Sequence, residues 1–166
     1  MRLVLKETEY GREGTVFCKL AGQEIDLLVP DEEVADEYIA QCISSLNSLS
    51  DRTIETIGRA AKCYCLKMKA LWAETGEEYD EVVSLPVSEN TPDKDMLKHC
   101  TISGMTIEAP EDEKRIGFQL DGSWDWEQEH GLEIIILDDK VLYLGMFEDH
   151  SPWFSYVPDE WNFALE

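Results

Sequence analysis

The stretch richest in chemically capable side chains is residues 121–132, which reads Asp-Gly-Ser-Trp-Asp-Trp-Glu-Gln-Glu-His-Gly-Leu. It combines two tryptophans, four carboxylates and one histidine in what the sequence predicts to be a loop. A carboxylate beside an imidazole is the pair that general acid–base catalysis uses. One interpretation is therefore a hydrolase in which Glu127 or Glu129 works with His130, with Asp125 as a further carboxylate.

A calcium site is the second chemistry that this stretch suggests. Asp121, Ser123 and Asp125 have the alternating oxygen ligands that open an EF-hand loop. The sixth position is Trp126 where the sharp turn requires glycine, and the twelfth is Leu132 where a bidentate glutamate belongs. The sequence therefore predicts no metal site.

Two non-catalytic interpretations of the same residues remain open. In the first, the tryptophans cover the edge of a sheet, Gly131 adopts an unusual backbone conformation and the acids are solvated. In the second, the aromatic rings anchor a partner protein and the carboxylates steer it. The binding candidates under this second interpretation are Trp124, Asp125, Trp126, Glu127, Glu129, His130 and Trp153.

The cysteines give no catalytic or metal pattern. Cys100 follows His99, but neighbours on a strand point to opposite faces, so no activated thiol is expected. Cys63 and Cys65 have C-x-C spacing on a predicted helix and cannot form a redox pair. Phosphate-binding, dinucleotide-binding and hydrolase signatures are also absent, so no cofactor is predicted.

The first thirty residues predict a three-stranded antiparallel meander, with turns at Gly11 to Gly14 and at Ala21-Gly22. Alternate apolar positions give one face of each strand to a core: Leu3 and Leu5, then Val16, Cys18 and Leu20, then Ile25, Leu27 and Val29.

Helical periodicity follows. Apolar residues recur every three or four positions over residues 31–49, and again after Ser50-Asp51, with Gly76 as the stop. We expect these two helices to form a central αα-hairpin. Residues 76–96 are acidic and lack periodicity, which predicts an exposed linker. The chain is predicted to be a single domain over residues 1–166, with a subdomain boundary near 76–96 as the alternative.

From residue 100 onward the pattern again indicates strands, at 100–107, 116–120, 132–137 and 141–147. Asp138-Asp139-Lys140 predicts a tight turn, so the last two strands should form an antiparallel hairpin. The aromatic residues after Ser151 are expected to dock onto a sheet or helix. The predicted fold class is thus α+β, with an N-terminal meander, a central helix pair and a C-terminal antiparallel sheet.

The net charge limits the classes of partner that the protein is expected to bind. The 166 residues include 36 acidic and 14 basic side chains, giving a net charge of −22. Such a charge opposes binding to nucleic acid phosphates and to anionic membranes, and favours a basic protein. Residues 51–75 carry five basic and three acidic side chains, whereas residues 108–166 carry three basic and 16 acidic ones. The C-terminal sheet is therefore the expected binding face.

The expected compartment is the cytoplasm. The N-terminus has no apolar segment of a secretory signal, and no window is apolar enough to span a bilayer. Five scattered cysteines are typical of thiols that stay reduced.

The run from Ile116 to Ile134, followed by Asp139 to Gly145, resembles the C-terminal signature of an uncharacterised bacterial domain family. In that signature a strand leads into a Trp-Asp-x-Glu-x-Gly-Leu loop and then a hairpin that ends in Val-x-x-x-Gly. Trp126 and Gln128 make the loop here one residue longer. Small acidic members of this kind are often found beside secreted toxins, so the resemblance implies an immunity-type role and no catalytic residues.

The leading hypothesis is thus a small acidic protein-binding protein, such as an immunity protein that neutralises a basic toxin domain. A hydrolase built on the 121–132 loop is the first alternative. A structural domain that dimerises through its helices is the second.

Overall fold

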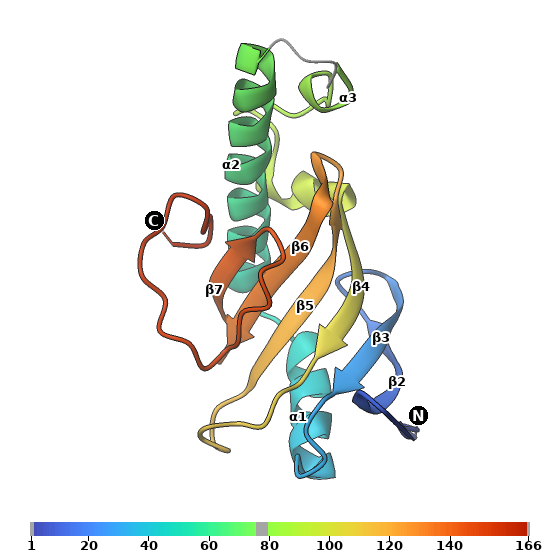
Figure 1. Cartoon of the computed structure of the whole chain (residues 1–166). Helices are drawn as coiled ribbons and strands as arrows, with labels where there is room; N and C mark the ends of the chain where they lie inside the picture. The colour runs from blue at the N-terminus through green and yellow to red at the C-terminus, as the bar shows by residue number, and fades with distance from the viewer. Residues whose placement is uncertain (1, 76–79, 166) are drawn as a thin grey trace.

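Seven strands form a single sheet in the computed structural model, which describes residues 2–75 and 80–165. The strands lie in chain order from β1 to β7, and every neighbouring pair is antiparallel except β3 and β4, which are parallel. The helices cover one face of this sheet and leave the other face open in its middle (Figure 1). The α+β class is therefore confirmed.

The N-terminal meander is confirmed with shifted ends. It consists of β1 (Lys6–Thr8), β2 (Gly11–Cys18) and β3 (Gln23–Val29). The predicted alternation holds, because the buried positions are Val16, Cys18, Ile25, Leu27 and Val29. The first turn comes earlier than predicted, at Glu9 and Tyr10, and the Gly11–Gly14 segment lies inside β2.

Two consecutive helices are present, but they do not form a hairpin. They are α1 (Asp36–Leu46) and α2 (Asp51–Thr75). Within the described residues they do not pack against each other; they follow one another along the same face of the sheet (Figure 1). The prediction of a helix pair was wrong because each helix buries its apolar stripe against strands. The predicted stop at Gly76 lies outside the described residues.

The start of α2 agrees with its sequence. The Ser50 hydroxyl oxygen accepts a hydrogen bond from the backbone N–H of Thr53 at 3.2 Å, as an N-cap does. α1 instead begins five residues later than predicted, because residues 31–35 form turns and Ala35 precedes the helix in an extended conformation.

The predicted exposed linker at 76–96 is described from residue 80 onward, and this part of the chain contains helical turns that pack on α2. These are α3 (Asp80–Val83) and the 3₁₀ segment η1 (Asp93–His99). Lys69 Nζ donates to the carbonyls of Leu85 and Val87 at 2.6 and 2.8 Å, and Lys62 Nζ donates to that of Thr91 at 2.9 Å. Two basic side chains of α2 thus hold the crossover that returns the chain to the sheet.

The C-terminal half supplies β4 (Cys100–Thr106), β5 (Gly117–Trp124), β6 (Glu127–Leu137) and β7 (Lys140–Gly145). The predicted β6–β7 hairpin is confirmed, with Asp138 and Asp139 at φ of 50° and 57° in its turn. The prediction of a loop at 121–132 was wrong. These residues form the far end of the β5–β6 hairpin, where Trp124 pairs with Glu127 around a turn at Asp125 and Trp126.

The two halves are joined by the parallel pairing of β3 with β4, in which Asp26 lies opposite Gly104. A separate meander and C-terminal sheet were expected, and the structure merges them into one. A parallel pair needs a long crossover, and α1, α2, α3 and η1 provide it.

The tip of the β5–β6 hairpin packs on α2 through aromatic rings. Trp124 and Trp126 stack with centroids 5.0 Å apart, and the Tyr64 ring meets both edge-on at 5.8 and 5.7 Å. Phe163 stacks on the other side of Tyr64 at 4.5 Å. These rings fix the upper half of the sheet to its helix.

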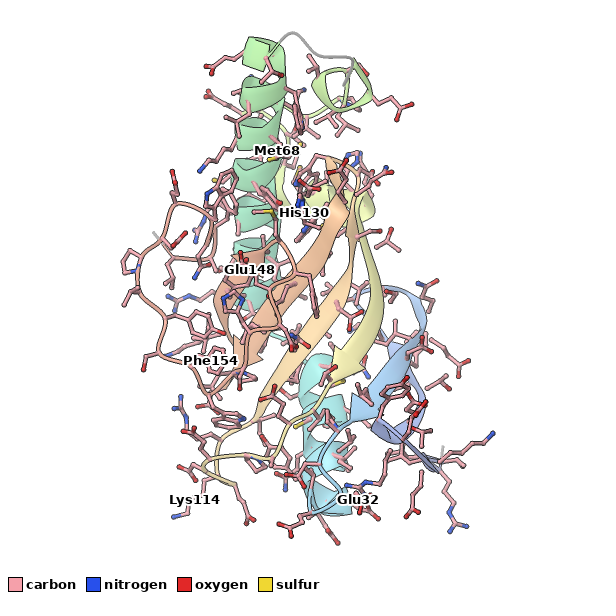
Figure 2. The ribbon with its side chains drawn as sticks, in the orientation of Figure 1. Glu32, Met68, Lys114, His130, Glu148 and Phe154 are labelled. Carbon is pink, nitrogen blue, oxygen red and sulfur yellow. The ribbon has the colours of Figure 1, made fainter. Side chains whose placement is uncertain are left out.

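The C-terminal segment runs along the outer edge of β7, as the aromatic composition predicted. Asn162 accepts a hydrogen bond from Leu144 N at 3.3 Å and donates one to Leu142 O at 2.9 Å. Lys67 of α2 lies 3.8 Å above the Trp161 ring centroid. Side chains on both sides of the molecule are shown in Figure 2. In the described part of the chain, no helix is both long and apolar enough to cross a membrane.

Candidate functional site

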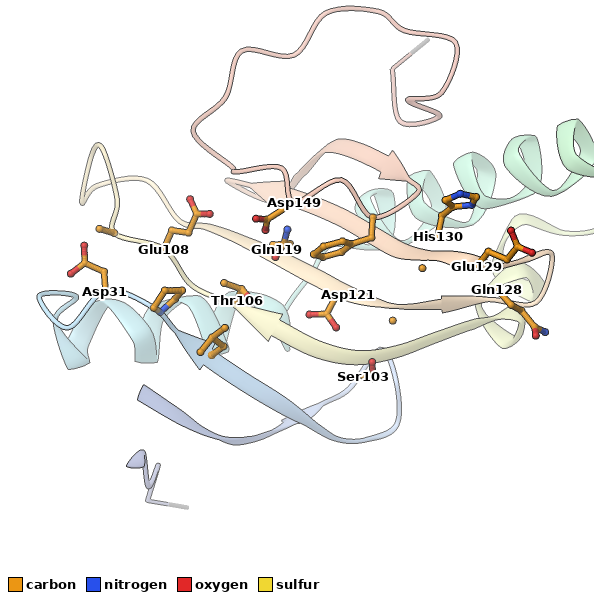
Figure 3. A pocket seen from close by; sticks show the side chains of 16 residues that line it. Asp31, Ser103, Thr106, Glu108, Gln119, Asp121, Gln128, Glu129, His130 and Asp149 are labelled. Atoms are coloured by element: carbon orange, nitrogen blue, oxygen red, sulfur yellow. The ribbon is translucent and has the colours of Figure 1, made fainter. Parts of the chain in front are cut away.

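A groove of about 1080 Å³ lies on the face of the sheet that the helices leave open. Its floor comes from β3, β4, β5 and β6, and its side from the segment that follows β7. Figure 3 shows Asp31 and Glu108 at one end, Asp121 and Gln119 in the middle, and Glu129 with His130 at the other end. We call this surface the acidic groove.

Carboxylates dominate the ionisable side chains of the acidic groove. Five line it, and neither lysine nor arginine is among the lining residues; the carboxylates are Asp31, Glu108, Asp121, Glu129 and Asp149. Phe147 also lines the groove and is 42% exposed, so an apolar ring lies among the charges. The surface combines negative potential with one aromatic contact point.

Three carboxylates lie in one row across the strands. Asp26 on β3 pairs with Gly104 on β4, Gly104 pairs with Asp121 on β5, and Asp121 pairs with Glu133 on β6. The glycine makes room, because a Cβ at Gly104 would lie 2.5 Å from a carboxylate oxygen of Asp121. Like charges at directly opposite positions destabilise a sheet, so this row needs compensation.

The negative charge of Glu133 is compensated by hydrogen-bond donors inside the protein. Its side chain is fully buried, and its Oε1 accepts hydrogen bonds from Gln119 Nε2 and His150 N, both at 2.6 Å. Its Oε2 accepts from Glu148 N at 3.0 Å and lies 2.8 Å from His150 Nδ1. These contacts fix the segment after β7 onto the sheet and thereby form the side of the acidic groove.

Asp121 has no such compensation. Among the described residues its carboxylate makes neither a hydrogen bond nor an ion pair, although the side chain is partly buried. Burial, together with the negative charges of Asp26 and Glu133, raises the pKa of Asp121 above its ordinary value. A cation placed over Asp121 would relieve this unfavourable environment.

The two tryptophans of the 121–132 stretch are not surface anchors. Trp124 and Trp126 are each only 1% exposed and belong to the hydrophobic core. Trp124 Nε1 donates to Gly145 O at 3.0 Å. The interpretation in which the tryptophans pack against the sheet is closer to the structure, since Gly131 does have an unusual φ of 74°. The rings, however, pack on α2 rather than over a sheet edge.

The predicted Glu127–His130 couple exists, with Glu127 Oε1 3.1 Å from His130 Nδ1. The same oxygen also accepts the backbone N–H groups of Glu129 and His130 at 3.0 and 3.2 Å. Glu127 is 7% exposed and therefore acts mainly as a cap for the local backbone. His130 and Glu129 are exposed and line the acidic groove.

The remaining candidates are separated from the groove. Asp125 Oδ2 lies 2.8 Å from Nδ1 of the buried His99, and this pair ties the hairpin tip to η1. Trp153 is half-buried and packs over the start of β5 near Gly117. Of the seven predicted binding residues, the structure therefore brings only Glu129 and His130 into the groove.

The environment of Cys100 is not that of an activated nucleophile. Its thiol donates to Met96 O at 3.3 Å, and burial raises the pKa of Cys100 far above its ordinary value. In the described ranges, no group of three or more histidine, cysteine, aspartate or glutamate side chains is arranged to hold a metal ion.

Sequence inspection missed most of the acidic groove. Gln119, Asp121 and Glu133 carry a detectable signal, because they are polar residues inside strands whose neighbours are apolar. Ser103, Thr106 and Asp149 carry none. Their proximity depends on the parallel β3–β4 pairing and on the return of the chain after β7.

The fold and the acidic groove define an α+β domain with one helix-covered face and one open acidic face. Residues 3–151 match the family described as "Domain of unknown function (DUF6985)", and the chain belongs to this family. No curated protein and no solved structure is detectably similar to this chain.

Proposed function

We propose that this protein is a protein-binding module whose acidic groove receives a basic segment of a partner. The observation that carries the proposal is Asp121, a partly buried carboxylate that lies between Asp26 and Glu133 without a hydrogen bond or ion pair among the described residues. A lysine or arginine from a partner would supply the missing positive charge. Phe147 offers the apolar contact that interface centres commonly use.

Charge at larger scale supports the same partner class. The net charge of −22 attracts basic proteins and accelerates their encounter, whereas it repels nucleic acids. A basic toxin domain such as a nuclease is the partner that we propose, because the carboxylates that line the acidic groove present negative charges in the manner of its phosphate substrate. The protein would then act as an immunity protein in the cytoplasm.

The test is a capture experiment with two triple variants of equal net charge. The groove variant carries Glu108→Gln, Asp121→Asn and Asp149→Asn, and the control carries Glu7→Gln, Glu37→Gln and Glu55→Gln on exposed sites outside the groove. If the groove binds the partner, the groove variant captures at least about tenfold less basic protein from the native host, a loss of about 1.4 kcal/mol. The control retains capture within about twofold.

Equal losses in both variants would reduce the effect to non-specific attraction and overturn the proposal. The immunity role is tested by co-expression with a toxin encoded beside the gene. Protection by the unmodified chain and its loss with the groove variant are expected. Survival that does not depend on the groove would contradict that role.

A hydrolase remains a second candidate because Glu127 and His130 are in contact and His130 opens onto the groove. A Glu129→Ala, His130→Ala variant distinguishes the two functions. Loss of a measurable turnover with partner capture unchanged would favour the enzyme. If the variant captures the partner normally and the unmodified chain shows no turnover, the hydrolase is ruled out.

A further inference from the structure

A second concave site, distinct from the acidic groove, lies between β7 and the C-terminal segment. It is a cavity of about 250 Å³. The side chains that give it its character are aromatic or acidic: Tyr143, Glu148, His150, Phe154, Tyr156 and Trp161. Figure 2 shows Glu148 and Phe154 on this side of the molecule. We call this site the aromatic cavity.

Hydrogen bonds hold several of the rings in place. Tyr143 Oη donates to Met146 O at 2.8 Å, and Tyr156 Oη donates to Ser151 O at 2.7 Å. The Nδ1 of His150 lies 2.8 Å from the buried carboxylate of Glu133. Because these polar atoms already have partners, the faces of the rings remain available to a ligand beside the polar lining residues.

The rings pack closely around His150 and together form one side of the cavity. The Tyr143 centroid lies 4.2 Å from that of His150 and 6.3 Å from that of Tyr156, and the Phe154 centroid lies 6.4 Å from that of His150. Ring faces attract cations, and the attraction strengthens when the site is shielded from water. Phe154 is 56% exposed and lies at the open side of the cavity.

The acidic residues that line the cavity also favour a cationic ligand. Glu148 and Asp159 line the aromatic cavity, where Glu148 Oε2 lies 3.5 Å from His150 Nε2, and no lysine or arginine is among its lining residues. Lys67 Nζ of α2 lies over the Trp161 ring and 3.6 Å from Glu160 Oε2, so its charge is matched.

From these observations we infer that the aromatic cavity binds the cationic head of one arginine or lysine side chain of the basic partner. Its volume lies below the roughly 300 Å³ at which pockets for drug-sized ligands begin, so a single side chain fits better than a whole ligand. This inference deepens the proposed function and shares its partner. The segment 147–150 separates the two sites: Phe147 and Asp149 line the groove, and Glu148 and His150 line the cavity.

The test uses small probes and the full chain, so it does not require the partner. N-acetyl-argininamide is titrated against the protein, with N-acetyl-citrullinamide as the neutral isostere, and the ring signals of Tyr143, Tyr156 and Trp161 are followed by NMR. Binding in the millimolar range is expected for the arginine probe. At least about tenfold weaker binding is expected for the citrulline probe, because it carries no charge.

Variants locate the site. Glu148→Gln and Phe154→Leu should each weaken binding of the arginine probe about threefold or more, and both residues are exposed enough to leave the fold intact. Tyr156→Phe keeps the ring and should retain most of the affinity, whereas Tyr156→Leu should lose it. Unfolding in urea verifies that each variant is folded.

Equal binding of the two probes, or ring signals that do not move while those of the acidic groove do, would overturn the inference. The outcome is separable from that of the capture experiment. Probe binding without partner capture would refute the proposed function alone, and capture without probe binding would refute the aromatic cavity alone.

Discussion

At the scale of single residues, Glu133 is the most consequential side chain on the open side of the sheet. A fully buried carboxylate is costly unless it is paired and hydrogen-bonded. Glu133 meets this condition with donors from Gln119, Glu148 and His150. The buried charge of Glu133, in the middle of an apolar strand, therefore anchors the segment after β7 to the sheet.

The first prediction concerns Glu133→Gln, which keeps the shape and replaces an acceptor by a donor facing other donors. We expect the free energy of unfolding to fall by about 3 kcal/mol, because buried donors lose their partner. Urea denaturation followed by circular dichroism measures this change. Glu129→Gln, an exposed site on the same strand, serves as the control and should change stability by less than about 0.5 kcal/mol. Equal effects would show that the Glu133 contacts add nothing.

The second residue-scale prediction follows from the raised pKa of Asp121. A carboxyl whose pKa is higher in the folded chain binds protons more tightly when folded, so its stabilising contribution is complete below the ordinary pKa of about 3.9. That contribution is lost as the pH rises through the raised pKa. Asp121→Asn should therefore increase the free energy of unfolding at pH 7, and the gain should shrink as the pH falls toward about 4.

Urea unfolding of Asp121→Asn across this pH range measures the effect, with the exposed Glu37→Gln as the control. A gain that does not vary with pH would indicate a cause other than the ionisation of Asp121. The same substitution should weaken partner capture, so stability and binding would change in opposite directions. That opposition is typical of a charge retained for function rather than for folding.

At the scale of elements, the C-terminal segment acts as a cover for β7. An unpaired edge strand readily pairs with other chains, and Asn162 and Phe163 occupy this edge by hydrogen bonding to Leu142 and Leu144. Phe163 also completes the stack on Tyr64 of α2. One short segment therefore closes the sheet and seals part of the helix-side core.

The prediction at this scale concerns a chain that ends at Pro158. We expect the free energy of unfolding to fall by about 3 to 5 kcal/mol, because the partly buried rings of Trp161 and Phe163 and the buried Asn162 are removed together. We also expect association that depends on concentration, because the edge of β7 becomes free. Urea denaturation and sedimentation velocity measure the two effects.

Val157→Ala is the control for this truncation, because Val157 is 70% exposed in the same segment. It should leave stability and the monomer unchanged. A truncated chain that is as stable and as monomeric as the full one would show that the segment is dispensable.

At the scale of the whole molecule, a net charge of −22 makes self-repulsion part of the energy balance. The basic residues of α2 reduce it locally by binding the crossover and the C-terminal segment, as Lys62, Lys67 and Lys69 do. Among the described residues, no lysine or arginine lines the acidic groove of the open face. The repulsion is thus concentrated where we place the partner.

Salt should therefore stabilise the isolated protein and weaken its complex. Raising the salt concentration from about 10 mM to about 0.5 M shortens the screening length from about 30 Å to a few ångströms, and the melting temperature should rise. Scanning calorimetry measures this. Association with the basic partner should slow over the same range. A melting temperature that falls with salt would contradict the dominance of self-repulsion.

The sequence by itself determined the local structure, because local structure depends on near neighbours. The alternation of apolar and polar residues indicated β2 and β3. The Ser50 cap indicated the start of α2, and Asp138-Asp139 indicated the β6–β7 turn. Charge composition also indicated the class of partner that we propose. These features need no information about contacts distant in the chain.

Only the tertiary structure decided where the chemistry lies. Trp124 and Trp126 look like surface anchors in sequence, but Tyr64 from another element buries them. Asp26 and Asp121 are far apart along the chain, and the parallel pairing of β3 with β4 brings them into one row. Strand order and long-range pairing arise from the burial of whole faces, and a residue's own neighbours in sequence carry no record of the partner strand.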